Sequence, residues 1–243
     1  MSRLGNDVSA EKSQAPLPLI LYSGMGADQR MFAAQLAAIP ELHVPDWLPP
    51  KRNETLRQYA RRMAAGLDPR QPCIIGGASF GGFLALEMLP FVNAKACLLV
   101  GGVRTPDELP WHLKLVRPLA PLCRLVPFQL FLWAAGFLGF TYGWLMPRRI
   151  REFLQLGGSL DANFFAWASQ AVLTWGREGP PPATTVPIYH IHGERDRILP
   201  IKLTKPTEVV PKGGHIIAVT HPEQVTAFIR RHDSLSPVLR GKG

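Results

Sequence analysis

A serine, an aspartate and a histidine that could act together in nucleophilic catalysis occur along the chain as Ser79, Asp196 and His215. A serine hydroxyl is a weak nucleophile near neutral pH, so it needs a histidine base, and the base needs a carboxylate that fixes its tautomer. A serine activated in this way attacks the carbonyl carbon of an ester, a thioester or an amide. The three residues therefore predict acyl transfer to Ser79, provided that the fold brings them together.

Ser79 lies in a G-x-S-x-G motif that occupies residues 77–81. The apolar run 72–77 predicts a strand, and the pattern over residues 83–89 predicts a helix. A strand, a sharp turn and a helix are the context in which this motif exposes a nucleophilic serine. Glycines two positions before and after the serine let the helix pack closely against the strand. The alternative interpretation is an ordinary strand-to-helix turn whose serine has no catalytic role.

Position along the chain indicates which histidine is the base. His215 follows the last predicted strand, 207–210, and parallel strands bring their carboxyl ends to one edge of a sheet. The remaining histidines have other places. His43 and His112 lie away from strand ends, and His190 and His192 lie in the strand that carries the acid. His221 lies in a capping box and His232 in the tail. We interpret His192 as a structural hydrogen-bonding residue.

The acid has one main candidate and one alternative. Asp196 follows the predicted strand 186–191, so its loop should open at the same edge of the sheet as the serine turn. Asp107, which follows the predicted strand 96–100, could also supply a carboxylate. Asp161 lies inside a long insertion and is a weaker candidate.

Two backbone N–H groups are needed to stabilise the oxyanion of the tetrahedral intermediate. The first donor is predicted to be the amide of Phe80, the residue directly after the serine. The second is expected from Met25, in the loop after the first strand, because Gly24 and Gly26 let the backbone turn toward the site. The alternative is a glycine-rich turn without this role.

Short apolar runs alternate with helical patterns along the chain, which is typical of an α/β fold with a mostly parallel sheet flanked by helices. Strands are predicted at residues 17–22, 72–77, 96–100, 186–191 and 207–210, with a weaker one at 43–47. Helices are predicted at residues 28–38, 54–67, 83–89 and 220–231. Asp28 can cap the first helix, and a capping box from Thr220 to Glu223, with Pro222 in the first turn, opens the last.

Residues 105–185 interrupt this alternation. They have a helical pattern and are rich in Leu, Phe, Trp, Pro and Gly, which predicts a helical cap over the strand ends, where open α/β sheets bind ligands. The core would then consist of residues 17–104 and 186–232. Residues 1–16 are predicted to be a flexible leader, and residues 233–243 a basic tail.

Taken together, these motifs resemble the α/β-hydrolase superfamily. The resemblance is carried by Gly24-Met25-Gly26, Gly77-Ala78-Ser79-Phe80-Gly81-Gly82, His192-Gly193-Glu194-Arg195-Asp196 and Gly214-His215. It covers the predicted core, and the insertion lies where that superfamily carries its cap. The chain has Ser23-Gly24 where the family often has His-Gly. Asp196 and His215 are only 19 positions apart, which predicts an abbreviated sheet edge between the last two strands.

The resemblance implies a serine hydrolase of the esterase or lipase type that needs no cofactor and no metal. The superfamily also contains carbon–carbon bond hydrolases, haloperoxidases and thioesterases, which the fold cannot separate. A non-catalytic protein that binds a small ligand under the cap is a further alternative. Its weakness is that a binding module has no need for a serine, an acid and a base together.

Composition limits the partners and the compartment. The net charge is +9, but the basic residues are scattered and carry no nucleic-acid-binding signature, so we interpret them as a solvated surface. The three cysteines are too few for a disulfide framework or a zinc site, and Cys73 and Cys97 are expected to be buried. With a polar N-terminus that lacks an apolar core, these features predict a cytoplasmic protein.

The insertion predicts the character of the substrate. Its aromatic residues are expected mostly to pack inside the cap, and some of them to line a pocket for a small, largely apolar acyl group. They are Trp111, Phe128, Phe131, Trp133, Phe137, Phe140, Tyr142, Trp144, Phe164, Phe165, Trp167 and Trp175. Residues 125–146 carry no formal charge, and we predict cap helices there rather than a membrane span, because a single crossing would separate the serine from its base. Contact of the cap with a membrane surface is left open.

Overall fold

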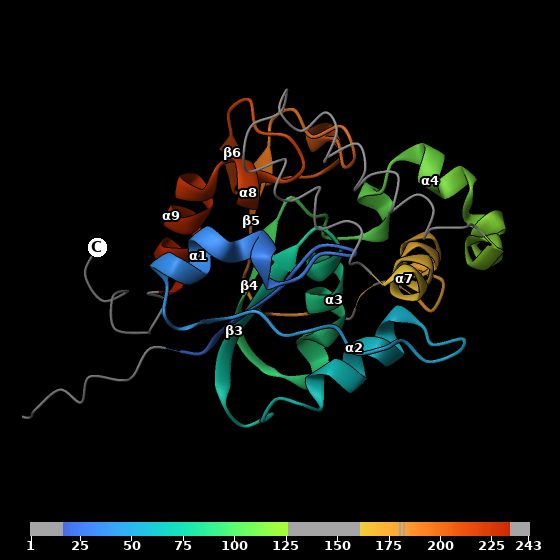
Figure 1. The fold of residues 1–243 in the computed structure, drawn as a ribbon, viewed down its shortest axis with the longest axis horizontal. Helices are drawn as coiled ribbons and strands as arrows, with labels where there is room; N and C mark the ends of the chain where they lie inside the picture. The colour runs from blue at the N-terminus through green and yellow to red at the C-terminus, as the bar shows by residue number, and fades with distance from the viewer. Residues whose placement is uncertain (1–16, 126–160, 180, 182, 234–243) are drawn as a thin grey trace, which may run out of the picture.

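The structure is a computed structural model that describes residues 17–125, 161–179, 181 and 183–233 (Figure 1). The predicted leader, residues 126–160 of the insertion and all but the first residue of the predicted basic tail lie outside the described residues.

A parallel sheet forms the centre of the molecule. Its six described strands are β1 (Leu19–Tyr22), β2 (Leu42–His43), β3 (Pro72–Ala78), β4 (Asn93–Val100), β5 (Ile188–Gly193) and β6 (Glu208–Val210). They lie in the order β2-β1-β3-β4-β5-β6, and every neighbouring pair is parallel. The carboxyl ends of all these strands therefore meet at one edge of the sheet. The predicted α/β fold with a mostly parallel sheet is confirmed.

Helices cover both faces of the sheet. The α-helices are α1 (Ala33–Ala38), α2 (Leu56–Ala64), α3 (Phe80–Met88), α4 (Trp111–Leu115), α7 (Ala162–Thr174), α8 (Ile217–Thr220) and α9 (Pro222–Asp233). Short 3-10 helices are η1 (Gln29–Phe32), η2 (Leu89–Phe91), η3 (Pro106–Glu108), η4 (Arg117–Leu125) and η7 (Ile201–Leu203). Figure 1 shows α1 and α9 on one side of the sheet and α2, α3 and α7 on the other.

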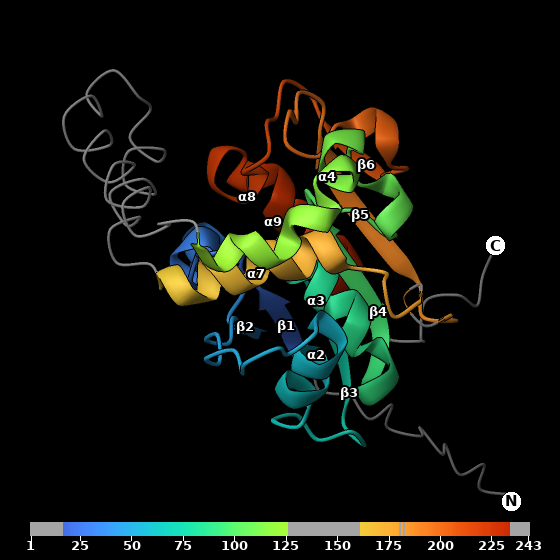
Figure 2. The same ribbon diagram turned by 90° about the vertical axis from the view of Figure 1, so that its right-hand side faces the viewer.

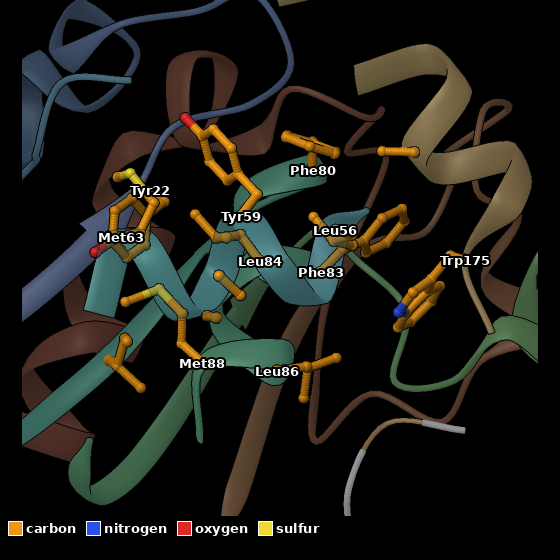
Figure 3. Close-up of a cluster of buried hydrophobic side chains, with 14 of the residues drawn as sticks. Tyr22, Leu56, Tyr59, Met63, Phe80, Phe83, Leu84, Leu86, Met88 and Trp175 are labelled. Carbon is orange, nitrogen blue, oxygen red and sulfur yellow. The ribbon is translucent and has the colours of Figure 1, made fainter. Parts of the chain in front are cut away.

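Alternation along the strands divides the core into two buried clusters. In β1, Leu19 and Leu21 belong to the cluster that includes residues of α1 and α9, whereas Ile20 and Tyr22 belong to the cluster under α2 and α3. This follows from the two-residue period of a strand, which sends successive side chains to opposite faces. Figure 3 shows part of the second cluster, in which α2 and α3 contribute Leu56, Tyr59, Met63, Phe80, Phe83 and Leu84.

The predicted helix 54–67 is observed as α2, with a capping box at its start. The Thr55 hydroxyl accepts a hydrogen bond from the Gln58 amide, and the Gln58 side chain accepts one from the Thr55 amide. Helix α2 buries Leu56, Tyr59, Ala60 and Met63, the apolar face that the sequence pattern indicates. The reciprocal cap fixes the first turn, so the helix begins at Leu56 rather than at residue 54.

Two local expectations were wrong. The weak strand predicted at 43–47 reduces to β2, because Pro45 cannot donate a ladder hydrogen bond, and the chain turns so that Trp47 packs into the core. The terminal helix, predicted to open with a capping box at Thr220, begins two residues later. Thr220 ends α8 instead, and its hydroxyl donates to the carbonyl of Ile216. The terminal helix begins at Pro222, as a proline in a first turn allows.

The described parts of residues 105–185 contain the helices η3, α4, η4 and α7, and α7 crosses the start of α3, where its Phe164 and Trp167 rings contact Phe80 (Figure 2). The Phe83 and Trp175 rings stack with centroids 4.7 Å apart, and the Trp167 indole N–H donates to the carbonyl of Glu54 at 2.8 Å. The Trp175 indole N–H donates to the buried carboxylate of Glu87 at 2.9 Å. These contacts attach α7 to the core on the α2 and α3 side.

The edge between β5 and β6 is abbreviated, as predicted. The described connection contains only the three-residue η7, and β6 is itself three residues long. Because β5 and β6 pair directly and in parallel, the loops after these two strands lie next to each other at the carboxyl edge of the sheet.

Candidate active site

The turn between β3 and α3 holds Ser79 in a conformation that is rare for a residue with a side chain. Its φ is +49° and its ψ is −116°, outside the common regions of the Ramachandran plot. The Ser79 amide donates to the carbonyl of Val100 at 3.0 Å, and the Ser79 carbonyl accepts from the Gly82 amide at 2.9 Å. Backbone strain of this kind persists only where surrounding contacts fix it, and it is concentrated at functional sites.

The glycines on either side of Ser79 permit a close approach to β1. A Cβ atom on Gly81 would lie 2.2 Å from the carbonyl oxygen of Tyr22, and one on Gly77 would lie 2.5 Å from the Gly81 carbonyl carbon. Neither position can hold a side chain without moving backbone, so the predicted reason for the two glycines is confirmed. The start of α3 is thereby pressed against the end of β1 and the loop that follows it.

His215 lies within hydrogen-bonding distance of both Ser79 and Asp196. Its Nε2 is 2.9 Å from the Ser79 Oγ, and its Nδ1 is 2.7 Å from Asp196 Oδ2. A carboxylate accepts hydrogen bonds, so the neutral ring carries its hydrogen on Nδ1 and presents a lone pair on Nε2 to the serine hydroxyl. The structure thus brings the three residues selected from the sequence into one continuous hydrogen-bonded row.

The Asp196 carboxylate is buried and surrounded by donors. Its Oδ1 accepts from the amides of Ile198 and Leu199, each at 2.9 Å, which fixes the orientation of the group. Burial alone would raise the pKa of Asp196, but hydrogen bonds from His192 and His215 and from the Leu199 amide lower it overall. The side chain therefore stays ionised well below neutral pH, as a group that orients and stabilises a histidine requires.

Backbone contacts between two loops bring Asp196 to His215. The Arg195 amide donates to the carbonyl of Gly213 at 2.7 Å. A Cβ on Gly193 would lie 2.1 Å from the Gly214 carbonyl oxygen, so only glycine fits where the loops after β5 and β6 cross. Gly193 of the HG-x-x-D segment thus has a steric reason, and a Cβ on Gly213 would lie 2.9 Å from the Ile217 side chain, whereas one on Gly214 would meet no atom within 4 Å.

The alternative acid, Asp107, lies elsewhere. It is exposed in η3, and its backbone carbonyl accepts a hydrogen bond from Lys114. Asp161 has a different role, because it caps α7 by accepting a hydrogen bond from the amide of Asn163. Of the three carboxylates considered, only Asp196 contacts His215 among the described residues.

The loop after β1 lies beside the start of α3, where the oxyanion donors were expected. A Cβ on Gly81 would be 2.5 Å from the Ser23 carbonyl, which shows how closely the two segments approach. Ser23 itself is buried, and its hydroxyl donates to the carbonyl of Ala27 at 2.7 Å. Ser23 therefore supports the loop internally at the position where the family often has histidine. The roles of the Met25 and Phe80 amides stay a prediction.

An apolar pocket of about 270 Å³ opens beside Ser79. The core contributes Met25, Phe80, Phe83, Ile198 and Leu199 to its lining, and the described part of the insertion contributes Leu113, Val116, Ser169, Val172 and Leu173. A space of this size and character suits an apolar group attached to the carbonyl carbon that a serine would attack.

The pocket lining partly corrects the expectation for the insertion's aromatic residues. Phe164, Trp167 and Trp175 are buried in the core cluster, and Trp111 is 75% exposed. The aromatic rings that line the pocket, Phe80 and Phe83, come from α3 instead. The residues of α7 that reach the pocket, Ser169, Val172 and Leu173, repeat at three and four positions, a helical spacing that could have indicated a second face of this helix. Phe128 to Trp144 lie outside the described residues.

The cysteines, possible metal ligands and long apolar helices were also considered from the sequence. Cys73 and Cys97 are buried free thiols, as expected, and burial raises the pKa of Cys97 to about 12. Among the described residues no cluster of histidine, cysteine, aspartate and glutamate could hold a metal ion. In the same part of the chain no helix is both long and apolar enough to cross a bilayer. Residues 126–146 of the uncharged segment lie outside the described residues.

Comparison with known proteins gives one match at the level of a family. The model of the alpha/beta hydrolase family matches residues 19–228, nearly the whole described chain. No curated protein sequence matches.

Solved structures share the fold at low sequence identity. A thermophilic esterase from Thermogutta terrifontis, with malate bound, is 22% identical, with a TM-score of 0.65 and 89% of each chain covered. An esterase from Exiguobacterium antarcticum is 17% identical, with a TM-score of 0.66 over 90% of this chain and 92% of that one. A bromoperoxidase from Bacillus anthracis is 14% identical, with a TM-score of 0.60 over 89% of this chain and 92% of that one. At these identities the likeness establishes a shared fold.

Proposed function

Since this chain belongs to the alpha/beta hydrolase family and is a hydrolase, we propose that it cleaves a carboxylic ester, thioester or amide through an acyl-enzyme on Ser79. The observation that carries the proposal is the hydrogen-bonded row from Ser79 Oγ through His215 to Asp196, with distances of 2.9 and 2.7 Å. A binding protein has no use for a strained, half-buried serine next to an oriented base.

In the proposed first half-reaction, His215 Nε2 accepts the hydroxyl proton as Ser79 Oγ attacks the substrate carbonyl. The imidazolium that forms is stabilised by the ionised Asp196, which itself stays deprotonated. The amides of Met25 and Phe80 would donate to the oxyanion. His215 then protonates the departing alcohol, thiol or amine, and the acyl group remains on Ser79.

In the second half-reaction, water replaces the leaving group. His215 removes a proton from the water, the hydroxide adds to the acyl carbonyl, and collapse of the intermediate releases the carboxylic acid and returns the proton to Ser79. The site needs no metal or cofactor for either half-reaction, because the serine, the base and backbone donors supply all the groups used.

We propose that the substrate carries a small, largely apolar acyl group. The pocket beside Ser79 is lined by aliphatic and aromatic side chains, with Ser169 as its polar member besides the nucleophile among the described residues. Leu113, Val116 and the α7 residues bring the insertion into contact with this pocket, which supports its predicted function as a cap over the site.

Labelling with a fluorophosphonate tests the nucleophile. The wild-type protein should form a covalent adduct on Ser79, and Ser79→Ala should lose both the adduct and at least about 10⁴-fold in p-nitrophenyl ester hydrolysis. Ser169→Ala is the matched control, because it removes a hydroxyl from the same pocket and should still be labelled. A Ser79→Ala variant that keeps more than a few per cent of the turnover would contradict the assignment.

The same protein can separate the alternatives. Esters, thioesters and amides of graded acyl length should be hydrolysed with a preference for apolar acyl groups. Labelling of Ser79 without hydrolysis of any of these would redirect the search to carbon–carbon bond cleavage or peroxide-dependent halogenation. Absence of labelling in a folded protein would favour the ligand-binding alternative.

The cytoplasmic location and membrane contact through the cap stay predictions. Such contact would depend, among the described residues, on the exposed apolar side chains of Trp111, Leu115 and Leu119.

A further inference from the structure

Two histidines of β5 lie directly behind the carboxylate of the site. His190 and His192 are two positions apart, so they share one side of the strand, and neither is exposed. His190 Nε2 lies 2.9 Å from His192 Nδ1. His192 Nε2 lies 2.8 Å from the carbonyl oxygen of Leu199 and 3.2 Å from Asp196 Oδ2. The hydrogen-bonded row that starts at Ser79 therefore continues from Asp196 into the interior.

The acceptors at one end determine where the hydrogens lie. The Leu199 carbonyl and the Asp196 carboxylate can only accept, so His192 carries its hydrogen on Nε2 and shares it between them. Its Nδ1 then accepts the hydrogen of His190 Nε2. The remaining nitrogen, His190 Nδ1, lies 3.4 Å from the Thr204 hydroxyl, which can donate to it. All donors of this row point the same way, toward Asp196.

This arrangement gives Asp196 Oδ2 two imidazole donors. His215 approaches it from the loop after β6 at 2.7 Å, and His192 approaches it from β5 at 3.2 Å. The other oxygen is occupied by the Ile198 and Leu199 amides. A hydrogen bond from His192 withdraws electron density from the oxygen that binds His215, and it also prevents the carboxylate from tilting away from that ring.

We propose that His192, oriented by His190, is a positioning residue that fixes the Asp196 carboxylate and limits the basicity that Asp196 confers on His215. The inference rests on the proposed function, because it concerns how the proposed base is tuned. His190 acts on His192 and not on the substrate. Neither ring contacts Ser79, so both act through Asp196.

The charged surroundings of the pair define how it should respond to pH. Among the described residues, Arg104, from the loop after β4, and Asp196 act on His190 electrostatically. Burial, helped by the neighbouring His192 and Arg104, lowers the pKa of His190 to about 3, so this ring stays neutral wherever the enzyme is folded and active. Neutral His190 then presents a constant donor to His192 Nδ1 across the working pH range.

His192→Leu tests the proposal. Without the donor, Asp196 becomes a better acceptor and stabilises the imidazolium of His215, so the acid-side midpoint of the kcat/KM profile should move to higher pH by about half a unit or more. At the plateau, kcat/KM should fall roughly tenfold, mainly through kcat, because a hydrogen bond to a charged group is lost. His192→Gln retains an N–H at a similar reach and should restore the midpoint to near the wild-type value.

The second ring keeps the test falsifiable if His192→Leu does not fold. His190→Leu should shift the midpoint in the same direction by less, since His192 loses its orienting donor, whereas His190→Gln should not shift it. His43→Leu, at an exposed position in β2, is the control for replacing any histidine. Rates should be normalised to the fraction of sites titrated by a fluorophosphonate.

The outcomes separate this inference from the proposed function. Unchanged midpoints in the folded Leu variants, with losses that match the fraction of titratable sites, would mean that the pair is only structural and would overturn the inference. That result leaves the labelling of Ser79 in the wild type intact. Loss of labelling in the wild type would instead remove the proposed function itself.

Discussion

The loops at the carboxyl ends of the strands and the described part of residues 105–185 build the site in different ways. The loops contribute polar groups held by backbone hydrogen bonds, as when the Ile198 and Leu199 amides hold Asp196. The insertion contributes apolar side chains, such as Val172, on a helix attached to α3 through ring stacking. We infer that the chemistry depends on the core, and that the choice of acyl group depends on the insertion.

The largest expected effect is in the core loops. Asp196→Asn should lower kcat roughly 10⁴-fold, because an amide can neither hold the His215 tautomer nor stabilise its cation. Asp107→Asn is the matched control and should stay near wild type, because Asp107 is exposed in η3. Steady-state kinetics on an activated ester measures both. The reverse order of damage would assign the acid to the insertion side and end the proposed division of roles.

A second effect should distinguish the two regions by their response to acid. Burial lowers the pKa of His190 from 6.5 to about 3, so between these values the unfolded chain binds a proton that the folded chain does not. The free energy of unfolding should therefore fall as the pH drops below 6.5, by at most about 1.4 kcal/mol per pH unit from this residue. His190→Gln should remove that part of the slope.

Urea unfolding between pH 6.5 and 5 measures this contribution. The pKa of Asp196 is lowered too, so this carboxylate loses its contribution to the free energy of unfolding only at pH values below 5. The contributions of His190 and Asp196 can therefore be separated. His112→Gln, at an exposed histidine in α4 of the insertion, should keep the wild-type slope. Equal slopes for all three proteins would show that the buried histidine does not contribute to acid sensitivity.

The smallest expected effect lies in the insertion and should change selectivity rather than chemistry. Val172→Phe should narrow the pocket and lower kcat/KM for an octanoyl ester about tenfold or more, while an acetyl ester stays within about threefold of wild type. Asn163→Leu, at an exposed position of the same helix, should leave kcat/KM for both esters unchanged. A uniform loss for both esters in Val172→Phe would mean that the insertion affects the chemical step as well.

Sequence reasoning was most successful where local pattern and covalent order carry the information. Uninterrupted apolar runs predicted the strands β3 and β4 because a parallel sheet is buried on both faces. The G-x-S-x-G motif predicted the turn at Ser79, since only glycine permits the backbone approach observed at Gly77 and Gly81. Both features follow from the identity of a few neighbouring residues.

It failed where a residue's neighbours in space outweigh those in sequence. Trp47 is part of a short run that resembles a strand, but its ring lies 4.9 Å from that of Phe164, more than a hundred positions away. Packing of the insertion's aromatic residues was expected, but not the partner of that packing, since Trp167 and Trp175 pack against α2 and α3 of the core. Hydrophobicity does not reveal which face of a helix meets which partner.

The sequence by itself determined the fold class and the candidate residues Ser79, Asp196 and His215, because their order and their places after predicted strands follow from the chain alone. Only the tertiary structure decided the hydrogen-bonding distances between them, which depend on the crossing of the loops after β5 and β6. The tertiary structure also places His190 against His192, a contact for which sequence reasoning gave no indication. A histidine in a strand becomes a donor to a buried network only when the sheet places a second imidazole and a carboxylate next to it, and no local pattern encodes that juxtaposition.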